Sequence, residues 1–236
     1  MHRNFISNAV VPILFVLVAT LSALFAAKFT HQEPIKQAPT EPQTEHIEEE
    51  VITPEHLISE YDNIFKEMGE KYELDWLLLA AIANSESRFQ AKAKSHVGAR
   101  GLMQIMPHVA RNMGYSKNEL YDVRTNVEIA AQLLIENKKM LHLPGGFDEE
   151  EGLKFLLACY NAGYSRIDDA IDVAKYFDAD TKNWKIVGLF LSWLSDPEFF
   201  ELEVVESGPF YGSQETLDYV EKVTETYRKY QEISKV

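Results

Sequence analysis

The chain has 236 residues, 46% of them apolar, which suits one domain with a sizeable core plus accessory segments. Its formal net charge of −14 argues against a nucleic-acid-binding protein, because such proteins normally carry a basic face. The single cysteine, Cys159, excludes an intramolecular disulfide and a cysteine zinc cluster, and the sequence predicts neither a metal site nor a cofactor.

The first segment in chain order is apolar. Residues 8–27 (NAVVPILFVLVATLSALFAA) carry no charge and lie between Arg3 and Lys28. A signal-peptide core has about 7–15 residues and a membrane-spanning helix about 20. We therefore expect residues 1–28 to be a retained signal anchor in the inner membrane, with a cleaved signal peptide as the alternative. Arg3 favours a cytoplasmic amino terminus, so we expect the chain after Lys28 to lie outside the cytoplasm, in the periplasm if the anchor is in an inner membrane.

A polar segment follows the predicted anchor. Residues 29–52 are rich in Pro, Gln, Thr and Glu and contain few large apolar residues. Such a segment cannot bury enough surface to offset the entropy of ordering, so we expect a flexible acidic stalk. The remainder, residues 53–236, is predicted to be one helical domain.

Helical patterning begins at Thr53, a capping hydroxyl followed by Pro54 in the first turn. We expect the first helix to start there, because apolar residues then recur at helical spacing on one face. Those residues are Leu57, Ile58, Tyr61, Ile64, Phe65, Met68 and Tyr72. Asp75 is predicted to cap a second helix, whose sequence WLLLAAIA is apolar on all sides, as in a central buried helix.

The later helices are predicted from similar patterns. One runs from near Asn126 through VEIAAQLLIENKKML and ends before the turn LPGGF. EEEGLKFLLACYNAG stops at Gly163, and YSRIDDAIDVAKYF is capped by Ser165. The last helix is SQETLDYVEKVTETYRKYQEI. FFELEVVESG is ambiguous, but no sustained strand-like alternation appears, so the fold class is predicted to be all-α.

Glu86 is the first candidate for chemistry. It lies about three turns after Asp75, at the carboxyl end of the predicted buried helix. Desolvation and the negative end of the helix dipole would both raise its pKa, and a protonated glutamic acid can serve as a general acid. The alternative is a surface residue paired with Arg88 or Lys92.

Two further stretches have the composition of a sugar groove. Gly98 and Gly101 favour tight turns, and LMQIMP then surrounds the amide of Gln104 with apolar side chains. An amide has both donors and an acceptor, which suits sugar hydroxyls. Tyr160 and Asn161 add a phenol and a second amide. The alternative is that the apolar members of LMQIMP are ordinary core.

Together these stretches resemble a known family. ESRFQAKAKSHVGARGLMQIMP, YNAG and ETLDYV resemble, in order, three motifs of the lytic murein transglycosylases with a soluble-lytic-transglycosylase (SLT) domain. The resemblance covers about Leu74 to Val223. NWKIVGLFLSWLSDPEFF and VVESGPFYGSQET most resemble the catalytic half of the membrane-bound subfamily F.

The resemblance implies a lysozyme-like helical domain of the goose type and assigns a role to several residues. Glu86 matches the catalytic acid, Tyr160 and Asn161 match residues near the cleaved bond, and Glu215 and Tyr219 complete the site. Ser87 follows the acid and matches a residue that hydrogen-bonds the helix end. The substrate-binding residues are predicted to be Ser87, Ser95, Met103, Gln104, Met106, Tyr160, Asn161, Glu215 and Tyr219.

The resemblance also implies a reaction on peptidoglycan glycan strands without a cofactor. Most glycosidases use two carboxylates, whereas this family uses one, which protonates the leaving oxygen and then deprotonates the sugar's own 6-hydroxyl to close a 1,6-anhydro ring. Two alternatives remain open. One is a hydrolase of the goose-lysozyme kind, with Glu215 holding the attacking water. The other is a non-catalytic peptidoglycan-binding protein.

Overall fold

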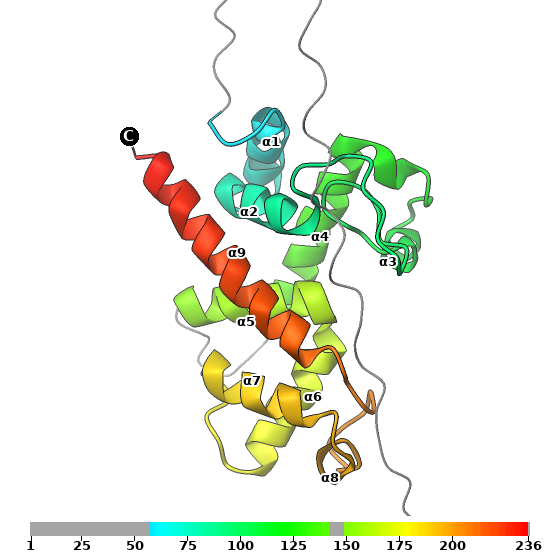
Figure 1. The fold of residues 1–236 in the computed structure, drawn as a ribbon, viewed down its shortest axis with the longest axis vertical. Coiled ribbons are helices and arrows are strands. Elements are labelled where there is room, and N and C mark those ends of the chain that lie inside the picture. Colours follow the sequence, from blue (N-terminus) through cyan, green and yellow to red (C-terminus); the bar gives the residue numbers. More distant parts are fainter. Residues whose placement is uncertain (1–56, 142–148, 236) are drawn as a thin grey trace, which may run out of the picture. The chain divides into compact units, whose positions relative to one another are not determined.

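The computed structural model describes residues 57–141 and 149–235, so the predicted anchor and stalk lie outside the described residues. The helices are α1 (Asp62–Tyr72), α2 (Trp76–Ser87), α3 (Pro107–Asn112), α4 (Val123–Met140), α5 (Glu149–Ala162), α6 (Tyr164–Tyr176), α7 (Trp184–Trp193), α8 (Pro197–Phe200) and α9 (Ser213–Ile233), with the 3-10 helix η1 (Glu119–Tyr121) (Figure 1). Within the described ranges there is no extended strand; isolated bridges join Lys94 to Arg100 and Arg100 to Ile105. The prediction of an all-α fold is therefore confirmed.

No helix within residues 57–141 and 149–235 combines the length and the apolar character that crossing a membrane requires.

The central helix is α2, as its sequence predicts. Leu79 and Ile82 have no exposed surface, and the helix packs against both α1 and α9. Asp75 caps it by accepting a hydrogen bond from the Leu77 N–H at 2.9 Å. An isolated helix of this length would be marginally stable in water, so α2 depends on the elements that enclose it.

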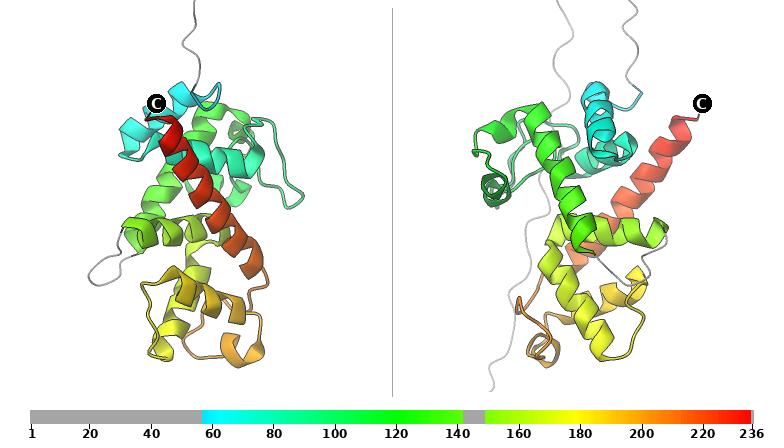
Figure 2. Two further views of the ribbon diagram at one scale, coloured as in Figure 1. Left: turned by 60° about the vertical axis from the view of Figure 1, so that its left-hand side comes forward. Right: turned by 180° about the vertical axis from the view of Figure 1, so that it is seen from behind.

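Helix α9 joins the two ends of the described domain. It has the bounds that its sequence pattern predicts and packs against α2, α5 and α7 (Figures 1 and 2). The Tyr227 hydroxyl donates to the Asp75 carboxylate at 2.6 Å, and the Asn84 amide donates to the Tyr230 hydroxyl at 2.7 Å. The carboxyl-terminal half of α9 is thereby bonded to α2, while its amino-terminal half lies on α5.

The first helix begins later than predicted. Thr53 and Pro54 lie outside the described residues, but residues 57–61 form bends and a turn, and α1 starts at Asp62. The Asp62 carboxylate accepts hydrogen bonds from the N–H groups of Ile58 and Ser59, both at 2.9 Å. These bonds turn the chain before the helix, so the apolar spacing upstream of Asp62 was misread as helical.

Other boundaries also differ from the predictions. Ser165 was expected to cap α6, but α6 begins at Tyr164 and its N-cap is Gly163, with φ of 89°. Gly163 does end α5, as predicted. Helix α4 starts three residues before Asn126, because the Asp122 carboxylate caps it. The short helices α3 and α8, as well as α7, were not assigned from the sequence.

Candidate active site

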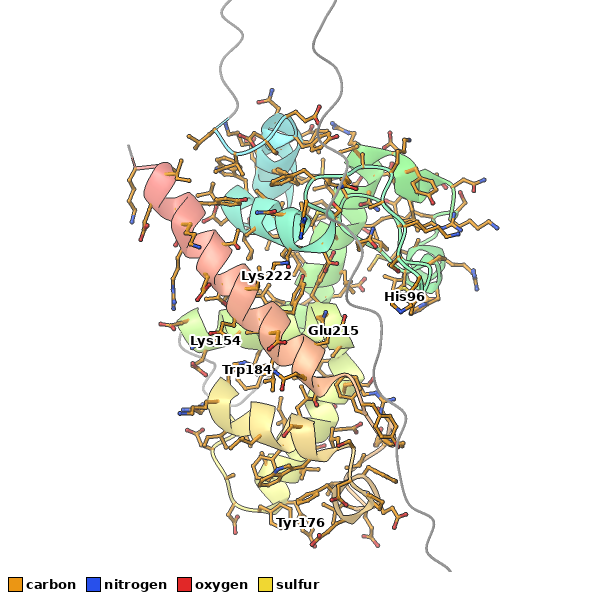
Figure 3. The ribbon with its side chains drawn as sticks, viewed as in Figure 1. His96, Lys154, Tyr176, Trp184, Glu215 and Lys222 are labelled. Atoms are coloured by element: carbon orange, nitrogen blue, oxygen red, sulfur yellow. The ribbon has the colours of Figure 1, made fainter. Side chains whose placement is uncertain are left out.

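A cavity of about 510 Å³ lies where α2, the loop between α2 and α3, α5 and α9 meet. Figure 3 marks three of its lining residues: Glu215 and Lys222 on α9, and His96 on the loop. The cavity brings together the predicted site residues Glu86, Ser95, Gln104, Met106, Tyr160, Asn161, Glu215 and Tyr219. Ser87 and Met103 are the predicted residues that do not line it.

The carboxyl group of Glu86 occupies the last turn of α2 and is partly buried. Burial is the main influence on its pKa and raises it from 4.5 to about 7. The Tyr219 hydroxyl and the positive charge of Lys222 lower this pKa, and the negative charge of Glu215 raises it. A carboxyl group with such a pKa is mostly protonated below neutral pH and can donate a proton.

The alternative, in which Glu86 is a surface residue in an ion pair, does not fit the structure. Among the described residues neither Arg88 nor Lys92 forms an ion pair with it. The Lys92 ammonium group donates instead to the Tyr121 carbonyl oxygen at 3.2 Å. The carboxyl group of Glu86 faces the cavity rather than a basic neighbour on its own loop.

Ser87 fixes the end of α2. Its hydroxyl donates to the Leu102 carbonyl oxygen at 2.7 Å and accepts from the Gln90 N–H at 3.1 Å. The next two residues, Arg88 and Phe89, have φ of 53° and 61°. Left-handed backbone is costly for side chains other than glycine, so Ser87 and its bonds hold a strained turn directly after the acid.

Two glycines shape the loop between α2 and α3, which forms part of the cavity wall. Gly98 and Gly101 have φ of 98° and 80°, which agrees with the predicted tight turns. A Cβ atom at Gly101 would lie 2.2 Å from the Leu120 carbonyl oxygen and 2.6 Å from the Asn126 amide nitrogen. Asn126, fully buried on α4, donates to the Arg100 carbonyl oxygen and accepts from the Met103 N–H.

Met103 supports the site from within the core. Its side chain is fully buried, so the alternative of ordinary core holds for this residue. Its carbonyl oxygen accepts a hydrogen bond from the Tyr160 hydroxyl at 2.9 Å. This bond ties α5 to the loop and orients Tyr160 in the cavity wall.

The amides of the wall have part of their hydrogen-bonding capacity already used. The Gln104 side chain donates to the Gly101 carbonyl oxygen at 2.8 Å, on a backbone with φ of 49°. The Asn161 oxygen accepts from the Thr216 hydroxyl at 2.8 Å. Among the described residues, the side-chain oxygen of Gln104 and the side-chain N–H groups of Asn161 have no hydrogen-bond partner. Both can therefore form hydrogen bonds with hydroxyl groups of a ligand.

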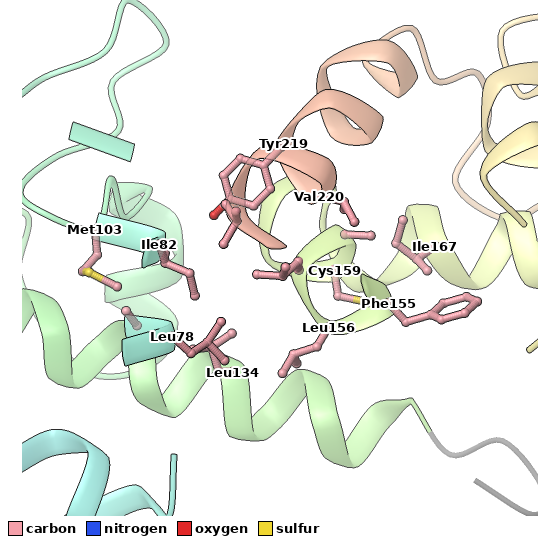
Figure 4. Packing of buried hydrophobic residues seen from close by; sticks show 14 of the residues in the cluster. Leu78, Ile82, Met103, Leu134, Phe155, Leu156, Cys159, Ile167, Tyr219 and Val220 are labelled. Carbon is pink, nitrogen blue, oxygen red and sulfur yellow. The ribbon is translucent and has the colours of Figure 1, made fainter. Parts of the chain in front are cut away.

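Tyr219 connects the cavity to the core. It is 8% exposed and belongs to the same buried cluster as Val220 and the α5 residue Cys159 (Figure 4). Its hydroxyl interacts with Glu86 and lowers the pKa of that carboxyl, but it lacks a well-aligned hydrogen-bond partner among the described residues. Burial and the negative charge of Glu86 raise the pKa of Tyr219 well above 10, so the phenol stays protonated and can only donate or accept a hydrogen bond.

Sequence reasoning missed Lys222, Asp218 and His96, which also line the cavity. Lys222 and Asp218 follow Glu215 at intervals of seven and three residues, so helical spacing would have placed them on the same face of α9. His96 belongs to the loop, where no periodic signal exists. In the described part of the chain no three His, Cys, Asp or Glu side chains are placed to hold a metal ion.

Comparison with known proteins gives a consistent picture. A family model described as the transglycosylase SLT domain matches residues 63–183. Membrane-bound lytic murein transglycosylase F of Marinobacter nauticus is 31% identical over 148 residues, which cover 62% of this chain and 28% of that protein. The protein of the same name in Yersinia enterocolitica is 31% identical over 183 residues, which cover 74% of this chain and 35% of that protein. The chain thus spans about a third of the length of the curated relatives it matches.

A solved structure agrees at the level of the fold. The lytic transglycosylase Slt from Pseudomonas aeruginosa superposes with a TM-score of 0.52 at 22% identity, over 73% of this chain and 24% of that one. This similarity shows that the helical fold predicted from the sequence resembles that of a lytic transglycosylase of known structure.

Proposed function

Because the chain belongs to the transglycosylase SLT domain family, we propose that it is a lytic transglycosylase that cleaves the glycan strands of peptidoglycan. The cleaved bond is the β-1,4 bond between N-acetylmuramic acid and N-acetylglucosamine, and the product ends in 1,6-anhydro-N-acetylmuramic acid. The observation that carries this proposal is the pKa of about 7 for Glu86, in a cavity lined by amides and tyrosines.

The mechanism uses Glu86 twice. As an acid it protonates the glycosidic oxygen, so the bond to the muramic anomeric carbon breaks with a neutral leaving group. The muramic 2-acetamido group stabilises the positive charge that develops at that carbon. The carboxylate then takes the proton of the muramic 6-hydroxyl, whose oxygen closes the anhydro ring. The hydroxyl is part of the same sugar, so it has a large proximity advantage over water.

The surrounding residues support both steps. The pKa of Glu86 lies above that of an ordinary carboxyl and close to neutral pH, which suits a group that must give and then take a proton. Gln104 and Asn161 offer the oxygen and the N–H groups that orient sugar hydroxyls, and Ser95 lines the same wall. Tyr160 and Tyr219 supply phenols that stay protonated.

A hydrolase is the second candidate, and one observation favours it. Glu215 lines the same cavity as Glu86 and is close enough for its charge to raise the Glu86 pKa. A second carboxylate near the acid can hold an attacking water, as in inverting glycosidases. Hydrolysis would leave reducing ends, whereas transglycosylation leaves anhydro ends that are lighter by one water.

The substitution Glu86→Gln tests the role of the acid. It keeps the shape of the side chain and removes its proton chemistry, so the release of soluble fragments from purified cell wall should fall by at least about 100-fold. Glu203→Gln is the matched control, because Glu203 is exposed and lies outside the cavity. Lysis that survives Glu86→Gln would show that Glu86 is not the acid.

We propose further that the enzyme acts in the periplasm, held at the inner membrane by residues 1–28. The support is the uncharged stretch 8–27, together with relatives whose name contains the words membrane-bound. The stalk, residues 29–52, would let the catalytic domain reach glycan strands away from the membrane.

A further inference from the structure

Lys222 places a positive charge in the cavity. It lies on α9, three residues after Tyr219, and its ammonium group donates to the Ser85 carbonyl oxygen at 3.4 Å. Ser85 and Glu86 line the same cavity as Lys222, which Figure 3 labels on α9. The lysine therefore stands directly beside the acid, on the helix that closes the site.

This charge is not neutralised by an ion pair. Among the described residues no carboxylate lies within 4.0 Å of the Lys222 ammonium group. Asp218, one turn earlier on the same helix, accepts a hydrogen bond from Gln214 at 2.8 Å instead. By contrast, Lys71 and Lys154 each pair with a glutamate. Lys222 is also the only lysine or arginine among the described residues that line the cavity.

The rest of the cavity wall would repel an anion. Glu215 and Asp218 both line it from α9, and the whole chain carries a net charge of −14. An anionic group could be held only where a cation outweighs these charges, which is next to Lys222. The position beside Glu86 means that such a group must belong to a sugar at the cleaved bond.

N-acetylmuramic acid has one such group. Its ring and acetamido group are neutral, and its negative charge is carried by the lactyl ether. The charge is either the lactyl carboxylate itself or a carboxylate of the peptide joined to it. We propose that Lys222 binds this carboxylate and so makes the enzyme select muramic units that carry a free negative charge. The inference rests on the proposed function, because it concerns the substrate of the same site.

The test compares two preparations of the same cell wall. One is native, and in the other the carboxylates are converted to neutral amides by carbodiimide coupling with ammonia. We expect the full chain to cleave the native wall roughly fivefold faster at limiting substrate, the size of effect that one partly exposed charge pair gives. Lys222→Gln should bring this ratio close to one, and Lys222→Arg should retain it.

The controls separate binding from other effects of the lysine. Lys229→Gln removes the same charge from α9 two turns further on, outside the cavity, and should leave the ratio unchanged. If Lys222 acted only through the pKa of Glu86, Lys222→Gln would change the rates on both preparations equally. Wall stripped of its peptides by an amidase carries lactyl carboxylates alone, so it shows which of the two carboxylates is bound.

Different results would overturn the inference about Lys222 and the proposed function. A ratio that stays at the wild-type value in Lys222→Gln, or a wild-type ratio near one, would overturn the inference and leave the proposed function standing. Failure of the wild-type chain to cleave either preparation, or cleavage that Glu86→Gln does not reduce, would overturn the proposed function itself.

Discussion

At the scale of single residues, the proposed reaction depends on the protonation of Glu86. Its position at the end of a buried helix was predictable from the spacing to Asp75, and desolvation was rightly expected to raise its pKa. The opposing effects of Lys222 and Tyr219 could not be predicted, because they come from a helix more than 100 positions away in the sequence. The position of Glu86 follows from its own helix, whereas its pKa also depends on side chains that tertiary structure brings close to it.

The pH dependence of lysis follows from these neighbours. The first step needs protonated Glu86, so activity should fall above pH of about 7. Removing a positive neighbour raises a carboxyl pKa, so Lys222→Gln should move this alkaline limb upward by roughly half a pH unit. Glu215→Gln removes a negative neighbour and should move the limb downward by a similar amount. The measurement is the rate of lysis against pH at fixed ionic strength.

Two results would contradict this account of Glu86. Shifts in the same direction for both variants would mean that neither acts through its charge. A limb that stays near pH 7 when Glu86 is replaced, with activity retained, would assign it to another group. Higher salt should reduce both shifts, because Glu215 and Lys222 are exposed to solvent.

At the scale of elements, long helices were predictable and their caps less so. The pattern over residues 213–233 gave the bounds of α9, because its apolar residues repeat over many turns. The prediction of Ser165 as a cap was wrong, since Gly163 is the N-cap and α6 starts immediately after it at Tyr164. Met103 and Gln104 are adjacent, yet one is core and the other lines the cavity. The Met103 N–H donates to the buried Asn126 side chain on α4, a contact that no local sequence pattern reveals.

The loop between α2 and α3 offers a direct comparison of two glycines. Gly101→Ala would drive a Cβ into the Leu120 carbonyl oxygen and the Asn126 amide, and it should lower the free energy of unfolding by about 3 kcal/mol or more. Gly98→Ala meets no atom within 4 Å and bears only the strain of its positive φ, about 1–2 kcal/mol. Denaturant titration of the full chain measures both values. Equal losses for the two variants would contradict the role given to Gly101.

At the scale of the whole molecule, the site depends on α9 returning to the end of α2. The Lys222–Ser85 hydrogen bond joins residues 137 positions apart. The family resemblance implied that residues of the three motifs form one site, and the structure brings residues of all three to one cavity. The packing of α9 against the end of α2 could not be predicted from sequence patterns. Each pattern indicates which face of a helix is apolar, but not which other helix covers that face.

The amino-terminal prediction concerns the whole chain as well. If residues 1–28 anchor the protein, it should sediment with membranes, resist extraction by high salt and dissolve in detergent. Deleting residues 1–28 should move it to the soluble fraction. A mature protein in the soluble periplasm whose amino terminus begins after residue 28 would instead establish the cleaved signal peptide.

The central claim is that the sugar's own 6-hydroxyl, and not water, attacks after Glu86 has donated its proton. Digestion of purified cell wall by the full chain in water enriched in oxygen-18, followed by mass spectrometry, tests it directly. The account predicts muropeptides with anhydro ends, lighter by one water than reducing ends and free of the heavy isotope. Reducing ends that carry one oxygen-18 atom from the solvent would contradict it and identify a hydrolase.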